Sequence, residues 1–371
     1  MSGGVRALAV PLALLLAVPV APVLQYLAGA PPVWVFVAGA VAVAALADWI
    51  RRATEEVAAR VGPAIGGLLN VSFGSLAELI LAAFVLAGGE ANVVRAQITG
   101  SIIGTSLLGL GLAVVAGSVG RGRQTFKRER AGQLSSMLIL VVIALLLPAV
   151  FDYTGRTVTG TRDLGLSEEA LSLGVSAVLL VLYGANLAYT LVTRRDAFAS
   201  GEPGDEGAGE GGEAGWPLWA SLGVLVAATA AIALEAELVS GALEATSGAL
   251  GLSPVFLGVV VLALIGTASD LFSAVWFARQ DKMGLVLSLC IGSAIQVALV
   301  IAPLLVLISW LMGRPMTLVF GNPLDLFAIA GAAFTVNAIA ADGETTWFEG
   351  VLLIGVYVLL GLAFFFVAPP A

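Results

Sequence analysis

This chain of 371 residues contains no histidine and few charged side chains. Charged residues make up 11% of it and hydrophobic residues 59%, whereas a soluble globular chain carries about 25% charged residues. The absence of histidine excludes histidine-activated nucleophiles, histidine proton relays and zinc sites that use imidazole. The single cysteine, Cys290, excludes an intrachain disulfide. Any ion chemistry must therefore use oxygen ligands, which suit hard cations.

Long apolar runs recur along the chain, and each is long enough to cross a bilayer as a helix. The first could instead be a signal peptide preceded by Arg6, but its apolar stretch exceeds a typical signal core, so we interpret it as a retained helix. The sequence predicts an all-α integral membrane protein with about eleven transmembrane helices. The predicted spans are 6–28, 33–50, 62–87, 92–117, 133–150, 168–193, 217–240, 254–279, 284–312, 322–340 and 346–367.

A glycine-rich acidic stretch divides these spans into two groups. Residues 196–215 hold six acidic residues and no basic one, a composition that cannot bury a core. We therefore predict an acidic loop at 194–216 and interpret it as a solvated linker, with a weak cation-attracting antechamber as the alternative. Lysine and arginine are concentrated on the side that holds this loop. The N-terminus and the loop are expected to be cytoplasmic and the C-terminus outside, in a prokaryotic plasma membrane.

Two of the apolar runs contain an acidic residue within a repeated motif. Glu78 ends the sequence GSLAE and Asp270 ends the sequence GTASD. A Gly-Ser pair follows each acid after 22 residues, in the next predicted span, as Gly100-Ser101 and Gly292-Ser293. The matching motifs and spacing indicate that the chain contains an internal repeat.

The number of intervening spans determines the relative orientation of the two copies. Five spans separate the two acids, so the copies run in opposite directions through the membrane. We predict inverted-topology repeats at 33–193 and 217–371, preceded by an extra first helix within 1–32. Inverted repeats are common in secondary transporters, where the ion site lies near the midplane between the halves.

Glu78 and Asp270 need compensation, because an ionised carboxylate at a bilayer centre costs about 3 kcal/mol or more. If the two meet near the pseudo-twofold axis, a divalent cation between them offsets their repulsion and desolvation. Without a cation, two carboxylates in a low dielectric bind protons instead. One pair can hold a cation or protons, but not both, which is the minimum machinery of a cation/proton antiporter. A buried pair with a purely structural role is the alternative.

Small and polar residues near the two acids complete the predicted cation and proton site. Gly74 and Gly266 each precede an acid by one turn, where glycine permits close backbone approach or a break that frees carbonyls. Plain helix packing is the alternative role for the small and hydroxyl residues. Oxygen ligands are expected from Ser75, Thr267, Ser101, Ser293, Gln97 and Gln296.

Other acidic residues are expected at the membrane surface or at a helix start. Asp48, Glu235 and Glu237 lie near predicted span ends and are expected to reach the interface. Residues 342–350 are predicted to begin the last helix, with Thr345 or Thr346 as its cap, and their acids are candidates for lining the ion path. No Walker motif is present, which argues against ATP-driven transport by this chain alone.

The sequence resembles the calcium/proton exchangers of the calcium/cation antiporter superfamily. Residues 66–80 (GGLLNVSFGSLAELI), 278–310 and 337–353 are similar to that family's signature stretches, and the resemblance covers nearly the whole chain after the first helix. It implies a fold of one plus five plus five helices and two acids that carry cation and proton in alternation. Family members move cytosolic calcium outward, or into a storage compartment, against entering protons.

Both signatures depart from the family pattern. Ser75 stands where the family has Asn, and residues 266–271 read Gly-Thr-Ala-Ser-Asp-Leu where Gly-Asn-Ala-Ala-Glu-His is usual. Thr105 stands where Asn is common, and Arg95 stands where Gln is common. Aspartate is one methylene shorter than glutamate, so the geometry of the site must differ. These changes bear on cation selectivity more than on the fold.

The sequence therefore predicts a secondary antiporter that exchanges a cytosolic cation for protons. Ca²⁺ is the expected cation, with Na⁺, K⁺ or Mn²⁺ as alternatives; no cofactor is expected. The expected partners are the lipid bilayer, the transported cation and protons, with no nucleic acid, and a homo-oligomer is left open. The alternative from another class is a cation-binding membrane sensor or scaffold without coupled transport.

Overall fold

The computed structural model describes residues 15–61, 73–157, 165–199 and 215–367. Within these ranges, nine helical segments are long and apolar enough to cross a membrane, and they correspond one to one to nine of the predicted spans. The other two predicted spans, 6–28 and 62–87, fall partly outside the described residues. Their described parts form the short turn η1 (Leu15–Ala17), α2 (Val20–Tyr26) and the apolar helix α5 (Leu76–Ala87). The predicted all-α membrane class is confirmed.

The remaining helices follow the predicted order along the chain. The first half contains α3 (Pro32–Val61), α6 (Ala91–Ile103), α7 (Leu110–Gly117), α8 (Arg128–Thr157) and α9 (Gly165–Ala199). The second half contains α10 (Leu218–Leu250), α11 (Pro254–Phe256), α12 (Ala263–Arg279), α13 (Met283–Gln296), α14 (Ala302–Leu311), α15 (Pro323–Ala340) and α16 (Trp347–Phe366).

In the described part of the chain, three membrane helices contain a π-helical segment, a feature that was not predicted from the sequence. They are η2 (Gly104–Gly109), η3 (Leu257–Leu262) and η4 (Val297–Ile301). Because η2 joins α6 to α7 and η4 joins α13 to α14, these two segments occupy matching places in the predicted repeats. Such segments loosen the backbone hydrogen bonding of a helix and are frequent at functional sites.

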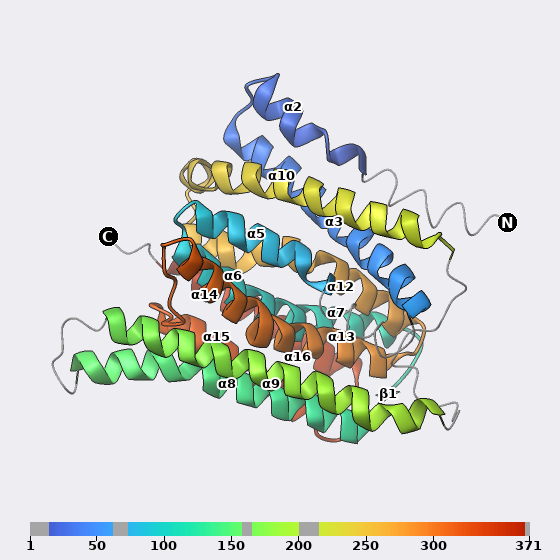
Figure 1. Cartoon of the computed structure of the whole chain (residues 1–371). Helices are drawn as coiled ribbons and strands as arrows, with labels where there is room; N and C mark the ends of the chain where they lie inside the picture. Colours follow the sequence, from blue (N-terminus) through green and yellow to red (C-terminus); the bar gives the residue numbers. More distant parts are fainter. Residues whose placement is uncertain (1–14, 62–72, 158–164, 200–214, 368–371) are drawn as a thin grey trace.

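Figure 1 shows the helices stacked in layers. Helices α3 and α10 lie together along one side, α8 and α9 lie along the opposite side, and α5, α6, α7, α12 and α13 lie between them. In the described part of the chain, α3 and α10 contact one another more extensively than any other pair. Helix α10 packs on α5, and α3 packs on α12. The α3–α10 pair therefore covers the two helices that carry Glu78 and Asp270.

Contacts between connecting segments agree with the predicted order of crossings. At one end, β1 (Gln124–Thr125) pairs antiparallel with β2 (Glu344–Thr345), and the Arg60 side chain donates to the Trp216 carbonyl. At the other end, Arg314 donates to the Ala87 carbonyl at 2.8 Å. Each of these contacts joins segments that the eleven-span prediction assigns to the same side of the membrane.

Several helices extend past their predicted bounds, because hydropathy marks only the apolar part of a helix. Helix α9 runs to Ala199, six residues into the predicted loop 194–216. Helix α10 runs to Leu250 and ends where Gly251 adopts a left-handed conformation, φ 65°. Glu235 therefore lies in the middle of α10 and is buried, so the expectation that it reaches the interface is wrong. Glu237, two residues further, is exposed.

The start of α16 matches its prediction. Thr346 is the N-cap residue, and its backbone N–H donates to Glu349 Oε2 at 2.7 Å. Glu349 therefore has a role in capping α16, since its carboxylate accepts the first free N–H of the helix.

Two glycines let α6 and η3 cross with their backbones in contact. A Cβ atom added at Gly100 would lie 1.9 Å from the Val259 carbonyl oxygen, and one added at Gly258 would lie 2.7 Å from the Val93 carbonyl oxygen. Small residues at such crossings let membrane helices approach closely. The crossing fixes the start of the helix that carries Asp270 against α6, which carries Gln97 and Ser101.

Gly100→Ala is expected to destabilise this crossing by about 1–3 kcal/mol, because backbone atoms of η3 cannot move aside as a side chain can. The loss would appear as a lower midpoint of thermal unfolding in detergent, followed by size-exclusion chromatography. Gly292→Ala is the matched control, since no atom lies within 4 Å of a Cβ at Gly292. Equal midpoints for the two variants would contradict the close crossing.

Candidate cation site

Glu78 lies in the first turn of α5, directly after a break in the backbone. Ser75 has non-helical angles, φ −103° and ψ 18°, and α5 begins at the next residue. The Glu78 side chain is 3% exposed. Its stem packs on α12, where a Cβ at Gly266 would lie 3.2 Å from Glu78 Cγ. Gly266, in the motif GTASD, thus leaves space for the side chain of Glu78, in the motif GSLAE.

Asp270 lies one turn after Gly266 on α12, so it follows the point where Glu78 meets that helix. Ser293 Oγ on α13 donates to Asp270 Oδ2 at 2.7 Å. The buried Ser101 hydroxyl on α6 lies near the Glu78 carboxyl group, and Ser101 Oγ has no hydrogen-bond partner among the described residues. The two carboxyl groups also interact electrostatically with each other. The structure therefore brings together both acids and a hydroxyl from the following helix of each half.

Gln97 lies one turn before Ser101 on the same face of α6 and is 1% exposed. Neither its amide oxygen nor its amide nitrogen has a hydrogen-bond partner. A buried amide without a partner is costly, and its oxygen is a suitable ligand for a hard cation. Gln296 ends α13, one turn after Ser293, at the start of η4.

Four predicted supporting residues differ from their expected roles in at least one respect. Thr267 Oγ1 donates to the Ala263 carbonyl of its own helix at 2.9 Å, a common arrangement for hydroxyl residues in membrane helices. Nothing lies within 4 Å of a Cβ at Gly74, so no close approach occurs there. The break falls at Ser75, and the Ser75 side chain makes no capping hydrogen bond. The predicted break at Gly266 is absent, since α12 is continuous through that residue.

Arg51 is a further neighbour of the site, and it was not among the residues predicted from the sequence. It lies on α3, and its positive charge acts on Asp270. Its guanidinium is held by Asp48 Oδ1 at 2.8 Å and by Glu55 Oε1 at 2.5 Å. The sequence offered only a basic pair next to a predicted span end, which is typical of a cytoplasmic boundary.

A second buried charged group lies behind α6. Asp325, at the start of α15, is buried, and one of its carboxylate oxygens has no hydrogen-bond partner. The charge of Arg95 acts on Asp325, and Arg95 Nε donates to the Thr317 carbonyl at 2.8 Å. Arg95 is two residues from Gln97 on a helix, so it points to a different side of α6.

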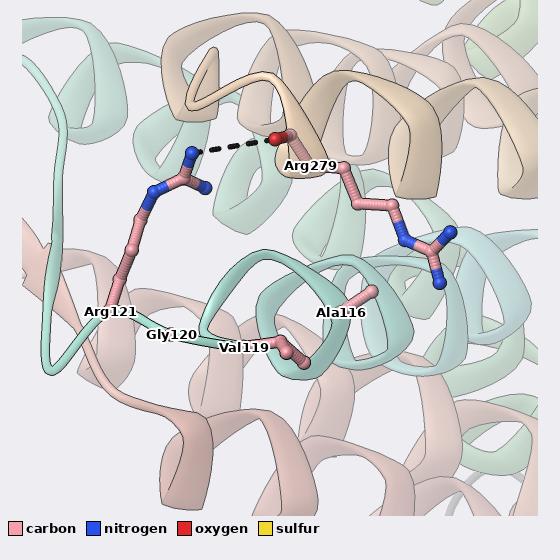
Figure 2. Close-up of a pocket in the computed structure, with 5 residues that line it drawn as sticks. All are labelled: Ala116, Val119, Gly120, Arg121 and Arg279. Carbon is pink, nitrogen blue, oxygen red and sulfur yellow. Dashed lines mark hydrogen bonds between the residues drawn. The ribbon is translucent and has the colours of Figure 1, made fainter.

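A surface hollow of about 420 Å³ lies at the end of α7 (Figure 2), apart from the two acids. Arg121 and Arg279 are the charged residues among its lining, and Arg121 donates to the Arg279 carbonyl at 3.5 Å. Two arginines repel a cation, so this hollow does not fit the predicted ligand. In the described ranges, no three acidic, histidine or cysteine side chains converge. A cation between Glu78 and Asp270 would therefore need hydroxyl, amide or backbone oxygens as further ligands.

Gly266→Ala is expected to lower the rate of Ca²⁺ uptake in proteoliposomes at least several-fold. The added methyl group would meet Glu78 Cγ and Cβ at 3.2 and 3.3 Å, which displaces the carboxyl group from its position. Gly74→Ala, at the same place in the first motif, is expected to be milder because the space there is open. Equal losses in the two variants would show that the glycine acts in some other way than by making room for Glu78.

Arg51→Gln is expected to lower the Ca²⁺ concentration for half-maximal uptake at low salt, because it removes a positive charge that acts on Asp270. The difference should shrink as ionic strength rises, since the screening length is about 10 Å at 0.1 M. Arg52→Gln is the control, because Arg52 also binds Asp48, at 2.7 Å. An unchanged value for Arg51→Gln at low salt would show that this charge does not reach the site.

Comparison with known proteins places these features in one family. A family model for the sodium/calcium exchanger protein matches residues 31–192 and 220–366. The Ca(2+)/H(+) antiporter of Aphanothece halophytica is 40% identical over 345 residues, which cover 90% of this chain and 90% of that antiporter. The Ca(2+)/H(+) antiporter ChaA of Bacillus subtilis is 34% identical over 336 residues, which cover 90% of this chain and 93% of ChaA.

Solved structures show the same similarity. Native YfkE superposes with a TM-score of 0.81 at 30% identity, covering 96% of this chain and 100% of YfkE. A crystal structure of the H+/Ca2+ exchanger CAX superposes with a TM-score of 0.71, covering 96% of this chain and 91% of that one; at 16% identity it shows the fold alone. The chain belongs to the sodium/calcium exchanger family and, within it, to the calcium/proton exchangers.

Proposed function

We propose that this protein is a secondary active antiporter that exchanges Ca²⁺ for protons across a membrane, with Glu78 and Asp270 as the shared binding groups. The observation that carries this proposal is the contact between the Glu78 side chain and α12 at Gly266, one turn from Asp270. It supports a site in which carboxyl groups from the two halves of the chain act together in the interior. The Ca²⁺/H⁺ antiporters at 34–40% identity support the same exchange.

The exchange follows from competition for the same oxygens. Ca²⁺ can bind to the carboxylates of Glu78 and Asp270. The Ser293 hydroxyl and the unpartnered amide oxygen of Gln97 lie on the neighbouring helices α13 and α6 and are candidates for further ligands. When the cation leaves, the two carboxyl groups take protons, because two adjacent negative charges without water or a cation are costly. The pair can carry one proton on each carboxyl group. Bound cation and bound protons thus exclude each other, which couples their movements.

Alternating access requires that the covering helices move. Helices α3 and α10 lie over α12 and α5 (Figure 1), so movement of this pair against the core would open the site to one side and then to the other. The repeats 33–193 and 217–371, with a separate first helix in 1–32, fit this division. We place the N-terminus and the acidic loop in the cytoplasm and the C-terminus outside, and cytosolic cation is exported.

The second candidate function is antiport of a different cation. The observation in its favour is that hydroxyl residues replace amide residues near the site. Thr267 and Thr105 stand where the family pattern has Asn, and both donate to carbonyls of their own helices. Asp270 is shorter than the usual Glu. The site thus offers fewer amide oxygens than the family pattern does, which bears on the choice among Ca²⁺, Mn²⁺, Na⁺ and K⁺.

The test is cation uptake into proteoliposomes driven by a pH gradient, with Ca²⁺, Mn²⁺, Na⁺ and K⁺ compared. We expect Ca²⁺ uptake that dissipates the gradient, and its loss to background in Glu78→Gln and in Asp270→Asn. Both variants keep the shape of the side chain and should retain the native elution profile. Full uptake in either variant would contradict the two-carboxylate mechanism. Ca²⁺-dependent thermal stabilisation of the native protein without flux would instead indicate a sensor or scaffold.

A further inference from the structure

Another acidic side chain is buried in the membrane region, away from the pair that carries the proposed exchange. Glu235 lies in the middle of α10 with 0% of its surface exposed. Both of its carboxyl oxygens lack a hydrogen-bond partner. It faces α3 at Gly39, where an added Cβ would lie 3.4 Å from Glu235 Oε2 and 2.8 Å from a Val239 methyl group. Glycine at position 39 therefore makes room for Val239, and the Glu235 carboxyl group lies beside it at the same contact between the two helices.

Among the described residues, the surroundings of Glu235 contain no charge that could balance an ionised carboxylate. Of the described helices packed on α10, α2 and α11 have no charged residue, and the only one on α5 is Glu78. On α3 the charged residue nearest to Gly39 is Asp48, roughly 13 Å further along the helix axis. On α10 itself, Glu237 and Glu244 are exposed and point elsewhere.

A carboxylate in such a place would be unpaired and desolvated, which costs several kcal/mol. Burial of the neutral acid costs much less free energy than burial of the carboxylate. In this conformation the carboxyl group therefore holds a proton. An apolar residue would fill the same space without that cost. An ionisable residue retained inside the membrane calls for a functional explanation.

The position of Glu235 relative to the acid pair supplies that explanation. Ile232, one turn before Glu235, belongs to a buried cluster with Ala77, the residue that precedes Glu78. Further along, Ser240 Oγ donates to the Phe84 carbonyl at 3.1 Å, so α10 follows α5 on both sides of Glu235. Any movement of the α3–α10 pair against the core changes the packing of α10 on α5 on both sides of Glu235, and with it the access of water to this carboxyl group. Its proton is therefore tied to the same movement that exposes the cation site.

We propose that Glu235 is a third proton-binding group, distinct from Glu78 and Asp270, which takes up and releases a proton as the α3–α10 pair opens and closes. This inference rests on the proposed antiport. In the closed arrangement without a cation the carboxyl group is neutral. When the pair opens toward the cytoplasm, the carboxyl group ionises and passes its proton to the water there. When the pair opens toward the outside, the carboxylate takes up a proton from the water on that side. The protein then exchanges more protons per cation than the acid pair alone can carry.

The test uses Glu235→Gln, which keeps the shape of the neutral acid but cannot exchange a proton. Ca²⁺ uptake and proton release are measured together in proteoliposomes across a range of pH values. We expect Glu235→Gln to fold and to transport Ca²⁺ with fewer protons exchanged per Ca²⁺ and a weaker dependence of rate on pH. Glu237→Gln, an exposed acid on the same helix, should match the native protein in both measurements.

Infrared spectroscopy tests the bound proton without relying on flux. The carbonyl band of a protonated acid should be present in the native protein, change when Ca²⁺ is added, and be missing its Glu235 component in Glu235→Gln. Absence of that component from the native spectrum would overturn the proposal, as would a native proton ratio and pH profile in Glu235→Gln. A native protein with no Ca²⁺ flux whose Glu235 band still responds to Ca²⁺ would refute the antiport while supporting the proton-binding group.

Discussion

The cost of burying negative charge in a membrane governs how this protein is built. Glu78 and Asp270 are both held in the interior, where neither could stay ionised and isolated. The chain limits the cost by placing the two together and giving each a hydroxyl from the next helix of its own half, Ser101 and Ser293. A site that must be neutralised by something from outside, either a cation or protons, is a site suited to exchange.

The arrangement of the helices around the site is suited to an alternation between neutralisation by a cation and neutralisation by protons. Long helices α3 and α10 form one unit over the core, joined to each other more extensively than to the helices beneath them. The core helices, by contrast, cross closely, as at Gly100 and Gly258, where backbones touch. The π segments η2 and η4 occur at matching places in the two halves, next to the helices that carry Ser101 and Ser293. A rigid core beneath a separate pair of helices fits an alternating-access mechanism.

The departures from the family pattern have a structural meaning. Thr267 and Thr105 replace the usual amides with hydroxyls that bond their own helices, so the polar surface left for a cation comes from fewer groups. Arg95, where Gln is common, ties α6 to the segment before α15 through the Thr317 carbonyl. These differences from the family pattern leave the fold intact, since the superposition on YfkE covers the whole of that protein.

The sequence by itself determined the class and the order of the spans, and it predicted the acid pair, because hydropathy and a repeated motif are local properties that can be read without coordinates. It also limited the cap of α16 to Thr345 or Thr346, and the structure has Thr346 in that position. The roles of the two motif glycines depended on tertiary structure: Gly266 receives the Glu78 stem, whereas Gly74 meets nothing. Likewise Glu235 looked like an interfacial residue, because the polar residues after it resemble a span end. Only the packing of α10 against α3 decided that it is buried, since burial depends on which helix lies opposite and not on the neighbours in sequence.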